Sequence, residues 1–226
     1  MRNICVIGAS RGIGKYLVNH LESQGNNVIS LARNKNECKN IINCDLNDFI
    51  SIEKAVEEVK NKYKTIYALI NVAGIASMNL ALATPAEVSR NIINTNLLGT
   101  IFSNQLFAPL IIRHGGGRII NFSTIAVKLG IKGESIYTAS KAGVESYTRS
   151  LAKELSSFNI TVNCIAPGPI DTDLIKGVSE NQIKKIVDQQ IFQKQMTPFD
   201  VADQVDLILS EKSRYLSGQV FVLGGY

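Results

Sequence analysis

Short runs of hydrophobic and β-branched residues recur along the chain, and amphipathic stretches fill most of the gaps between them. The first amphipathic stretch places Ile13, Leu17 and Leu21 four residues apart, as one face of a helix requires. Strands that alternate with helices are typical of βαβ units, whose strands lie parallel in one sheet. We therefore predict strands over residues 4–7, 27–32, 41–44, 66–71, 118–122, 160–165 and 220–223.

A glycine-rich segment over residues 8–14 joins the first predicted strand to the first predicted helix. Glycines let the backbone approach a pyrophosphate, and the free N–H groups and dipole of a helix N-terminus favour its negative charge. The spacing G-x-x-x-G-x-G has a wider first gap than the usual dinucleotide fingerprint, so a purely structural turn is the alternative interpretation. The position at the first strand-to-helix turn favours nucleotide binding.

The length and composition are consistent with one domain. A chain of 226 residues with 45% hydrophobic content can bury a full core, and α/β folds of this size commonly form a single domain. We therefore predict an α/β fold over residues 1–226, a Rossmann-type doubly wound parallel sheet of about seven strands flanked by helices. Such sheets bind ligands beyond the carboxyl ends of their strands, and the candidate motifs all follow strands.

Charge and cysteine usage exclude several functional classes. The formal charge of +5 is spread along the chain, and Lys184 and Lys185 are typical of a solvated helix face. The four cysteines show no C-x-x-C spacing, and Cys5 and Cys164 lie in apolar strand-like runs. No apolar run approaches the length of a membrane span. We expect a soluble, cytoplasmic protein with no metal site that binds neither nucleic acid nor membrane.

Tyr137 and Lys141 lie four residues apart in a segment with helical periodicity. One helical turn places both side chains on the same face, where the ammonium would favour the phenolate and lower the pKa of the tyrosine. Tyr137 is therefore a candidate general acid. Tyr and Lys also occur at this spacing on solvated helices by chance, so the pair indicates a catalytic site only together with the other motifs.

Several further motifs follow one another in a fixed order along the chain. They are residues 8–14, Asp45 with Leu46, residues 71–74, residues 96–99, Ser123 with Thr124, Tyr137 with Lys141, and Pro167 with Gly168. In this order they resemble the classical short-chain dehydrogenases/reductases over residues 3–226. Within that family the layout of residues 179–202 and 217–225 is most similar to that of 3-oxoacyl-acyl-carrier-protein reductases.

The charged side chains at the end of the second predicted strand indicate which nicotinamide cofactor binds. In such folds an acidic residue there binds the adenosine ribose 2′-OH, whereas arginine accommodates a 2′-phosphate. Here the strand ends in Ala32 and Arg33, with no carboxylate before Glu37. Arg33 and Arg11 would form a two-sided clamp, because guanidinium groups match phosphate geometry. We therefore predict NADP(H) rather than NAD(H).

The resemblance also assigns the other cofactor contacts. Asp45 is expected at the adenine amino group, residues 71–74 at the adenosine ribose, and Ile170 with Thr172 at the nicotinamide carboxamide. The full set implied is Gly8, Ser10, Arg11, Gly12, Ile13, Gly14, Arg33, Asp45, Leu46, Asn71, Ala73, Gly74, Tyr137, Lys141, Pro167, Gly168, Ile170 and Thr172.

The resemblance implies carbonyl reduction, in which hydride passes to a ketone carbon and Tyr137 donates a proton to the oxygen. Lys141 would tune Tyr137 and contact the nicotinamide ribose, while Asn96 would hold a water that passes protons to Lys141. The family usually has serine 13 residues before the tyrosine, where this chain has Thr124. Threonine offers the same O–H donor, so we assign the carbonyl-polarising role to Thr124 and keep Ser123 as the alternative.

The substrate stays open between a 3-oxoacyl thioester on an acyl carrier protein and another small hydrophobic or sugar-like ketone. Arg113 is a candidate contact for an acidic carrier, whereas Phe158 stands where carrier-dependent relatives often have arginine. A substrate lid is expected around residues 173–197, with apolar residues that suit an acyl chain. A catalytically weak NADP(H)-binding sensor or assembly protein is the alternative from another functional class.

Relatives of this layout are usually tetramers in which the helices over residues 97–113 and 136–157 pair with their counterparts. We expect a homotetramer, with a dimer as second choice. The apolar residues expected to support it are Leu106, Leu110, Val144, Tyr147 and Leu151.

Overall fold

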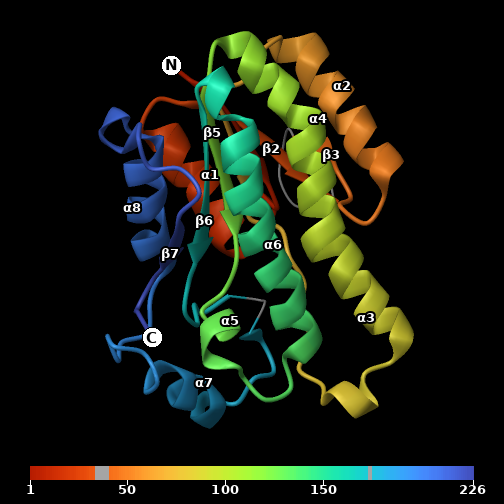
Figure 1. Cartoon of the computed structure of the whole chain (residues 1–226), viewed down its shortest axis with the longest axis vertical. Coiled ribbons are helices and arrows are strands. Elements are labelled where there is room, and N and C mark those ends of the chain that lie inside the picture. Colours follow the sequence, from red (N-terminus) through yellow and green to blue (C-terminus); the bar gives the residue numbers. More distant parts are fainter. Residues whose placement is uncertain (34–40, 173–174) are drawn as a thin grey trace.

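Seven parallel strands form one sheet in the order β3-β2-β1-β4-β5-β6-β7 (Figure 1). The order reverses between β1 and β4, which makes the carboxyl ends of these two strands the switch point where such sheets bind ligands. The predicted doubly wound sheet is confirmed. The strands are β1 (Asn3–Ile7), β2 (Asn27–Ala32), β3 (Ile42–Asn43), β4 (Ala68–Asn71), β5 (Gly117–Phe122), β6 (Ile160–Ala166) and β7 (Val220–Val222).

This computed structural model describes residues 1–33, 41–172 and 175–226. Glu37, Cys38, Asp173 and Leu174, which entered the sequence predictions, lie outside the described residues.

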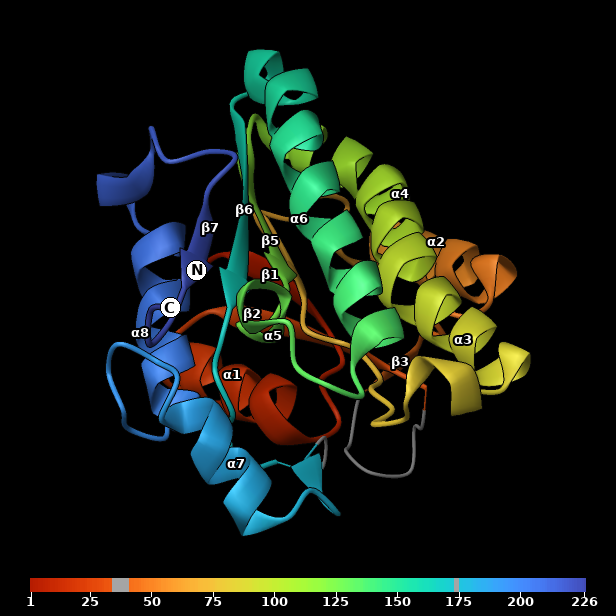
Figure 2. The ribbon, with the colours of Figure 1, turned by 60° about the horizontal axis from the view of Figure 1, so that its bottom comes forward.

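Helices cover both faces of the sheet, as Figure 2 shows. On one face α1 (Gly12–Ser23) packs beside α8 (Pro198–Leu209), and on the other α2 (Phe49–Tyr63) and α6 (Ser135–Glu154) flank α4 (Gly99–His114). Helix α3 (Ala86–Ile93) continues through the π-helical turn Asn94–Leu98 into α4. Two shorter helices are α5 (Ala126–Leu129) and α7 (Glu180–Val187), and short 3-10 turns occur elsewhere in the described chain.

The two faces of the sheet carry two hydrophobic cores. Alternate residues of β1 divide between them: Cys5 and Ile7 pack with α2 and α4, and Ile4 and Val6 pack with α1 and α8. This division follows from the two-residue period of a strand, and burial of both faces explains why the strands read as continuous apolar runs.

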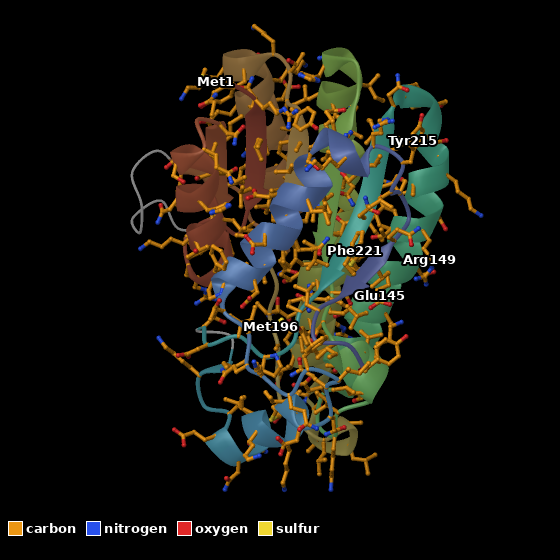
Figure 3. The ribbon with its side chains drawn as sticks, turned by 90° about the vertical axis from the view of Figure 1, so that its left-hand side faces the viewer. Met1, Glu145, Arg149, Met196, Tyr215 and Phe221 are labelled. Atoms are coloured by element: carbon orange, nitrogen blue, oxygen red, sulfur yellow. The ribbon has the colours of Figure 1, made fainter. Side chains whose placement is uncertain are left out.

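The edge strand β7 lies between α8 and α6 in the side view of Figure 3, with Phe221 on the strand. Three of the five residues expected at a tetramer interface are instead buried in the chain's own core. Leu110, Val144 and Leu151 are 2%, 0% and 6% exposed, because these helices turn that side toward the sheet. Leu106 and Tyr147 are partly buried against the same core.

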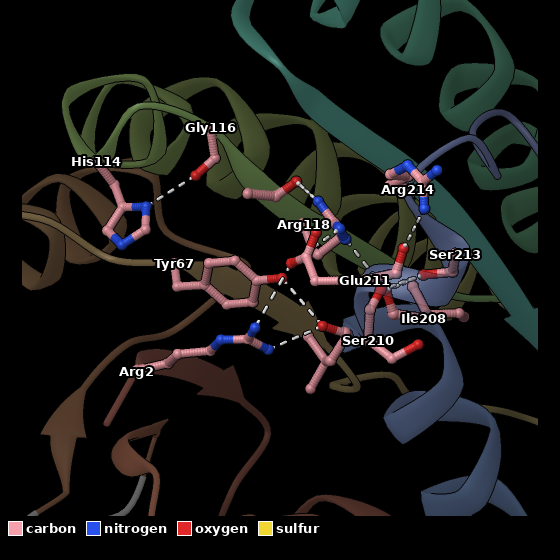
Figure 4. A network of polar contacts seen from close by, with 12 residues as sticks. Arg2, Tyr67, His114, Gly116, Arg118, Ile208, Ser210, Glu211, Ser213 and Arg214 are labelled. Atoms are coloured by element: carbon pink, nitrogen blue, oxygen red, sulfur yellow. Dashed lines mark hydrogen bonds and ion pairs between the residues drawn. The ribbon is translucent and has the colours of Figure 1, made fainter.

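A polar network at the amino ends of the strands fixes the C-terminal end of α8 (Figure 4). The Tyr67 hydroxyl and the Arg2 guanidinium donate to the carbonyl of Leu209, and Arg118 donates to the carbonyl of Ile208. Cationic and hydroxyl donors thus satisfy carbonyls that a helix end leaves without partners. The network lies at the end of the sheet opposite the switch point.

Candidate active site

The glycine turn brings the N-terminus of α1 against the segment that follows β4. Gly8 has φ +96°, and a Cβ on it would lie 2.7 Å from the backbone nitrogen of Ala73, so only glycine fits. A Cβ on Gly14 would collide with the carbonyl of Gly8. The first turn of α1 has no side-chain cap, which leaves its leading N–H groups to bind an anion.

A first cavity at this turn gathers most of the residues predicted to bind the cofactor. Arg11 and Arg33 both line it, although Arg11 follows β1 and Arg33 follows β2. The Asp45 carboxylate at its wall accepts a hydrogen bond from the backbone of Asn47 at 3.0 Å. The predicted residues that line this cavity are Gly8, Ser10, Arg11, Gly12, Ile13, Gly14, Arg33, Asp45, Leu46, Ala73, Gly74 and Thr172.

Asn71 departs from the prediction that it lines the adenosine ribose. Its side chain is buried, donates to the Oδ1 atoms of Asn104 and Asn121 at 2.7 and 2.9 Å, and accepts from the Ser103 hydroxyl. Asn121 in turn donates to Thr148 of α6. Because the last residue of β4 points into this interior network, its amide joins the sheet to α4 and α6 and does not reach the cavity.

A second cavity of about 320 Å³ holds the predicted catalytic residues Tyr137, Lys141, Thr124 and Ser123. Ile170 and Thr172, which were predicted at the carboxamide, line it as well, together with the predicted cofactor-binding residues Pro167 and Gly168. The two cavities share Ile13, Val72, Gly74 and Thr172, so they form one continuous groove at the carboxyl ends of the strands.

Tyr137 and Lys141 are both buried, on one face of α6 as the helical spacing predicts. Burial raises the pKa of Tyr137, the charge of Glu134 raises it further, and a hydrogen bond from Thr124 opposes the shift. The net shift in the pKa of Tyr137 is therefore upward, and the lowering expected from Lys141 stays a prediction. The phenol stays protonated at neutral pH, which suits a proton donor.

Lys141 is held away from water by the end of β5. Its Nζ donates to the carbonyl of Phe122 at 2.9 Å, and burial lowers its pKa to about 8. A Cβ on Gly74 would lie 3.2 Å from this Nζ and 3.4 Å from Oδ1 of Asn96, so both side chains flank Gly74.

Asn96 is placed by the π-helical turn between α3 and α4 and has no exposed surface. Its amide accepts from the N–H of Ile75 and donates to the carbonyl of Ile75, both at 2.8 Å, and it also donates to the Ser140 hydroxyl. Asn96 thus fixes the loop beside Lys141. Its predicted role in holding a water stays a prediction.

The two adjacent hydroxyls after β5 point to different partners. Thr124 lines the cavity together with Tyr137, and its hydroxyl acts to lower the pKa of the tyrosine. Ser123 donates to Oε1 of Glu145 at 2.8 Å, and Glu145 is buried and forms an ion pair with Lys128 at 3.3 Å. Ser123 is therefore engaged in the interior, and the carbonyl-polarising role of Thr124 stays a prediction.

The lid region contributes only part of the apolar residues that the sequence suggested. Ile175, Ile183 and Ile186 line the second cavity. Ile191 and Phe192 are instead 70% and 72% exposed, beyond the end of α7.

Several cavity residues were missed from the sequence, namely Met78, Ile125, Ile131 and Glu134. They come from loops whose apolar residues show no periodicity. For Glu134, the position three residues before Tyr137 was the one sequence signal that could have placed it in the cavity.

Arg113 and Phe158 do not lie at the mouth of the groove. Arg113 is in the last turn of α4, just before β5 begins, and Phe158 directly precedes β6. Both therefore lie at the amino ends of the strands, whereas the groove is at the carboxyl ends. Neither residue bears on how a carrier protein would reach the site.

The residues present fit a nicotinamide dinucleotide. The uncapped N-terminus of α1 and the glycine turn suit a pyrophosphate, and the second cavity places a proton donor beside an apolar wall. No cluster of His, Cys, Asp or Glu suited to a metal ion occurs among the residues that the structure places, and none of the helices it describes is both long and apolar enough to cross a membrane. The fold and the groove define a nicotinamide-dependent oxidoreductase.

Comparison with known proteins gives the family. A family model described as enoyl-(acyl carrier protein) reductase matches residues 8–226. Carbonyl reductase family member 4 of Danio rerio is 33% identical over 97% of this chain and 95% of its own length. The 3-oxoacyl-[acyl-carrier-protein] reductase FabG of Staphylococcus aureus is 30% identical over 99% of this chain and 97% of its own length.

Solved structures agree with these sequence matches. The aldohexose dehydrogenase of Thermoplasma acidophilum superposes with a TM-score of 0.89 at 26% identity, covering 99% of this chain and 93% of that one. The chain therefore belongs to the short-chain dehydrogenase/reductase family, and within it is most like the 3-oxoacyl-acyl-carrier-protein reductases.

Proposed function

We propose that this protein is an NADP(H)-dependent carbonyl reductase that interconverts a ketone and a secondary alcohol. The observation that carries the proposal is that the hydroxyls of Thr124 and Tyr137 line one cavity, which is continuous with the dinucleotide groove. A ketone oxygen between the two hydroxyls would receive one hydrogen bond from each. Such positioned donors stabilise the negative charge that develops on the oxygen.

The bound nicotinamide supplies the hydride, and the residues of the chain handle the oxygen and the proton. Thr124 holds the carbonyl oxygen and Tyr137 transfers its phenolic proton to it. Lys141, with a pKa lowered to about 8 by burial, is placed next to Gly74 and Asn96 to contact the nicotinamide ribose. A lysine with a pKa near neutrality can return a proton to the site after each turnover.

The preference for NADP(H) rests on Arg11 and Arg33, which line the adenosine end of the groove from two different loops. Two guanidinium groups would bind a 2′-phosphate from both sides. Ala32, at the end of β2, offers no carboxylate to a ribose 2′-OH.

The substrate we propose is a small hydrophobic ketone. The wall of the second cavity includes Met78, Ile125, Ile131, Ile175 and Ile186, which suits an apolar chain. A 3-oxoacyl thioester carried by an acyl carrier protein is one candidate, supported by the likeness to FabG. A sugar-like ketone is the other, supported by the likeness to an aldohexose dehydrogenase.

We propose a cytoplasmic homotetramer as the working form. Cys5, Cys44 and Cys164 are free and buried, as fits a reducing compartment. The edge strand β7 presents unpaired backbone groups that closed symmetry would protect.

The test is a panel of ketones, including a 3-oxoacyl thioester, followed by the absorbance of NADPH. Tyr137→Phe should abolish reduction and leave NADPH binding nearly intact, because it deletes the proton donor with little change in packing volume. Retention of more than a tenth of the wild-type turnover would contradict the assignment of Tyr137. Tight NADPH binding without turnover on any ketone would favour the sensor or assembly alternative.

A further inference from the structure

Glu134 is an acidic residue within the substrate cavity that the proposed reaction does not use. It immediately precedes α6 and, among the described residues that line this cavity, is the only carboxylate. Its backbone is fixed, since its N–H donates to Ile131 and its carbonyl accepts from Thr138. The charge of the carboxylate reaches the phenol of Tyr137, whose pKa it raises.

The carboxylate of Glu134 has no protein partner in the described part of the chain, where no hydrogen bond or ion pair engages it. Partial burial raises its own pKa, because removal of water disfavours the charged form. A carboxylate is a strong hydrogen-bond acceptor, and this one is half-buried beside the reacting residues, so a donor group on the substrate would find it available.

The charges around Glu134 decide which donor fits. Lys141 also lines the cavity, so a cationic substrate group meets an ammonium group as well as the carboxylate. An anionic group would be repelled by Glu134 itself. A neutral hydroxyl meets neither penalty and gains a charge-assisted hydrogen bond.

We infer that Glu134 is a specificity-determining residue that binds a hydroxyl group next to the reacting carbonyl, so that the substrate is a hydroxy ketone with an apolar chain. The inference rests on the proposed function and narrows its substrate class. A 3-oxoacyl thioester has no hydroxyl beside its ketone, so the inference favours the hydroxylated ketones over it.

The experiment compares two ketones that differ only in this hydroxyl, hydroxymethyl hexyl ketone and methyl hexyl ketone, with NADPH as reductant. The measured quantity is the ratio of their kcat/KM values in the wild type, Glu134→Gln, Glu134→Leu and Ser135→Ala. Any effect of Glu134 on the acidity of Tyr137 acts on both ketones and cancels in the ratio. Ser135 is exposed, neighbours Glu134 and is outside the lining residues, which makes it the matched control.

The wild type and Ser135→Ala should prefer the hydroxy ketone by about tenfold or more, as expected for a hydrogen bond to a charged group. The preference should shrink in Glu134→Gln, whose amide oxygen still accepts, and vanish in Glu134→Leu. Circular dichroism checks the fold, and the isosteric Glu134→Gln decides the test if the leucine variant does not fold.

Two results would overturn the inference and leave the proposed function standing: equal kcat/KM for both ketones in the wild type, or an unchanged ratio in the folded Glu134 variants. Reduction of neither ketone, nor of any other ketone in the panel, by folded wild-type protein would overturn both.

Discussion

Replacing each of the two adjacent hydroxyls after β5 tests which one acts on the substrate. Thr124→Val keeps the shape of the side chain and removes the donor that faces Tyr137. Loss of a hydrogen bond to a developing oxyanion lowers turnover by about 10²- to 10³-fold. The variant also loses the bond that the Thr124 hydroxyl accepts from the N–H of Ala126, at 3.2 Å, so a small loss of stability is expected as well.

Ser123→Ala should affect stability and leave turnover nearly unchanged. Ser123 is 4% exposed, and its hydroxyl donates to Glu145, which is 2% exposed. Its removal leaves one buried carboxylate oxygen without that donor, which costs about 1–3 kcal/mol. For a domain of this size each kcal/mol lowers Tm by roughly 2–4 °C.

The assays are initial rates of NADPH consumption on a ketone from the panel and thermal unfolding followed by circular dichroism. Thr124→Ser, which keeps the hydroxyl, is the control and should retain most of the turnover. If Ser123→Ala loses turnover and Thr124→Val does not, Ser123 polarises the carbonyl and the reasoning from the Glu145 hydrogen bond fails.

Three further predictions address the cofactor, the buried lysine and the assembly. NADPH should bind at least about tenfold tighter than NADH, and Arg33→Ala should erase most of the difference; equal dissociation constants by titration calorimetry would contradict the clamp. Burial lowers the pKa of Lys141 to about 8, so the unfolded chain binds more protons than the folded chain between about pH 8 and 10.5. The free energy of unfolding of the wild type, relative to Lys141→Met, should therefore rise with pH in that window by about 2–3 kcal/mol. Urea unfolding at pH 7.5 and 10 measures this difference, and a constant difference would count against it. Light scattering at micromolar concentration should give a tetrameric mass, and a monomeric mass would refute the proposed assembly.

The sequence by itself determined the features that local geometry controls. Short apolar runs located each strand of the described residues within about two residues, because burial on both faces of a parallel sheet demands continuous apolar runs. The glycine turn could be predicted because Gly8 and Gly14 occupy backbone positions where a Cβ would collide with neighbouring backbone atoms. The Tyr137 and Lys141 pair was readable because one helical turn alone places both on one face.

Only the tertiary structure decided matters that depend on partners distant in sequence. Thr124 and Ser123 are adjacent, yet successive side chains at a strand end face opposite ways, so contacts with Tyr137 and Glu145 separate them. Whether Asn71 faces the cavity or the interior depended on where α4 places Asn104. The position of Glu134 in the cavity, without a partner among the described residues, could not be predicted from the sequence. Burial and pairing depend on how the whole chain packs and leave no local pattern.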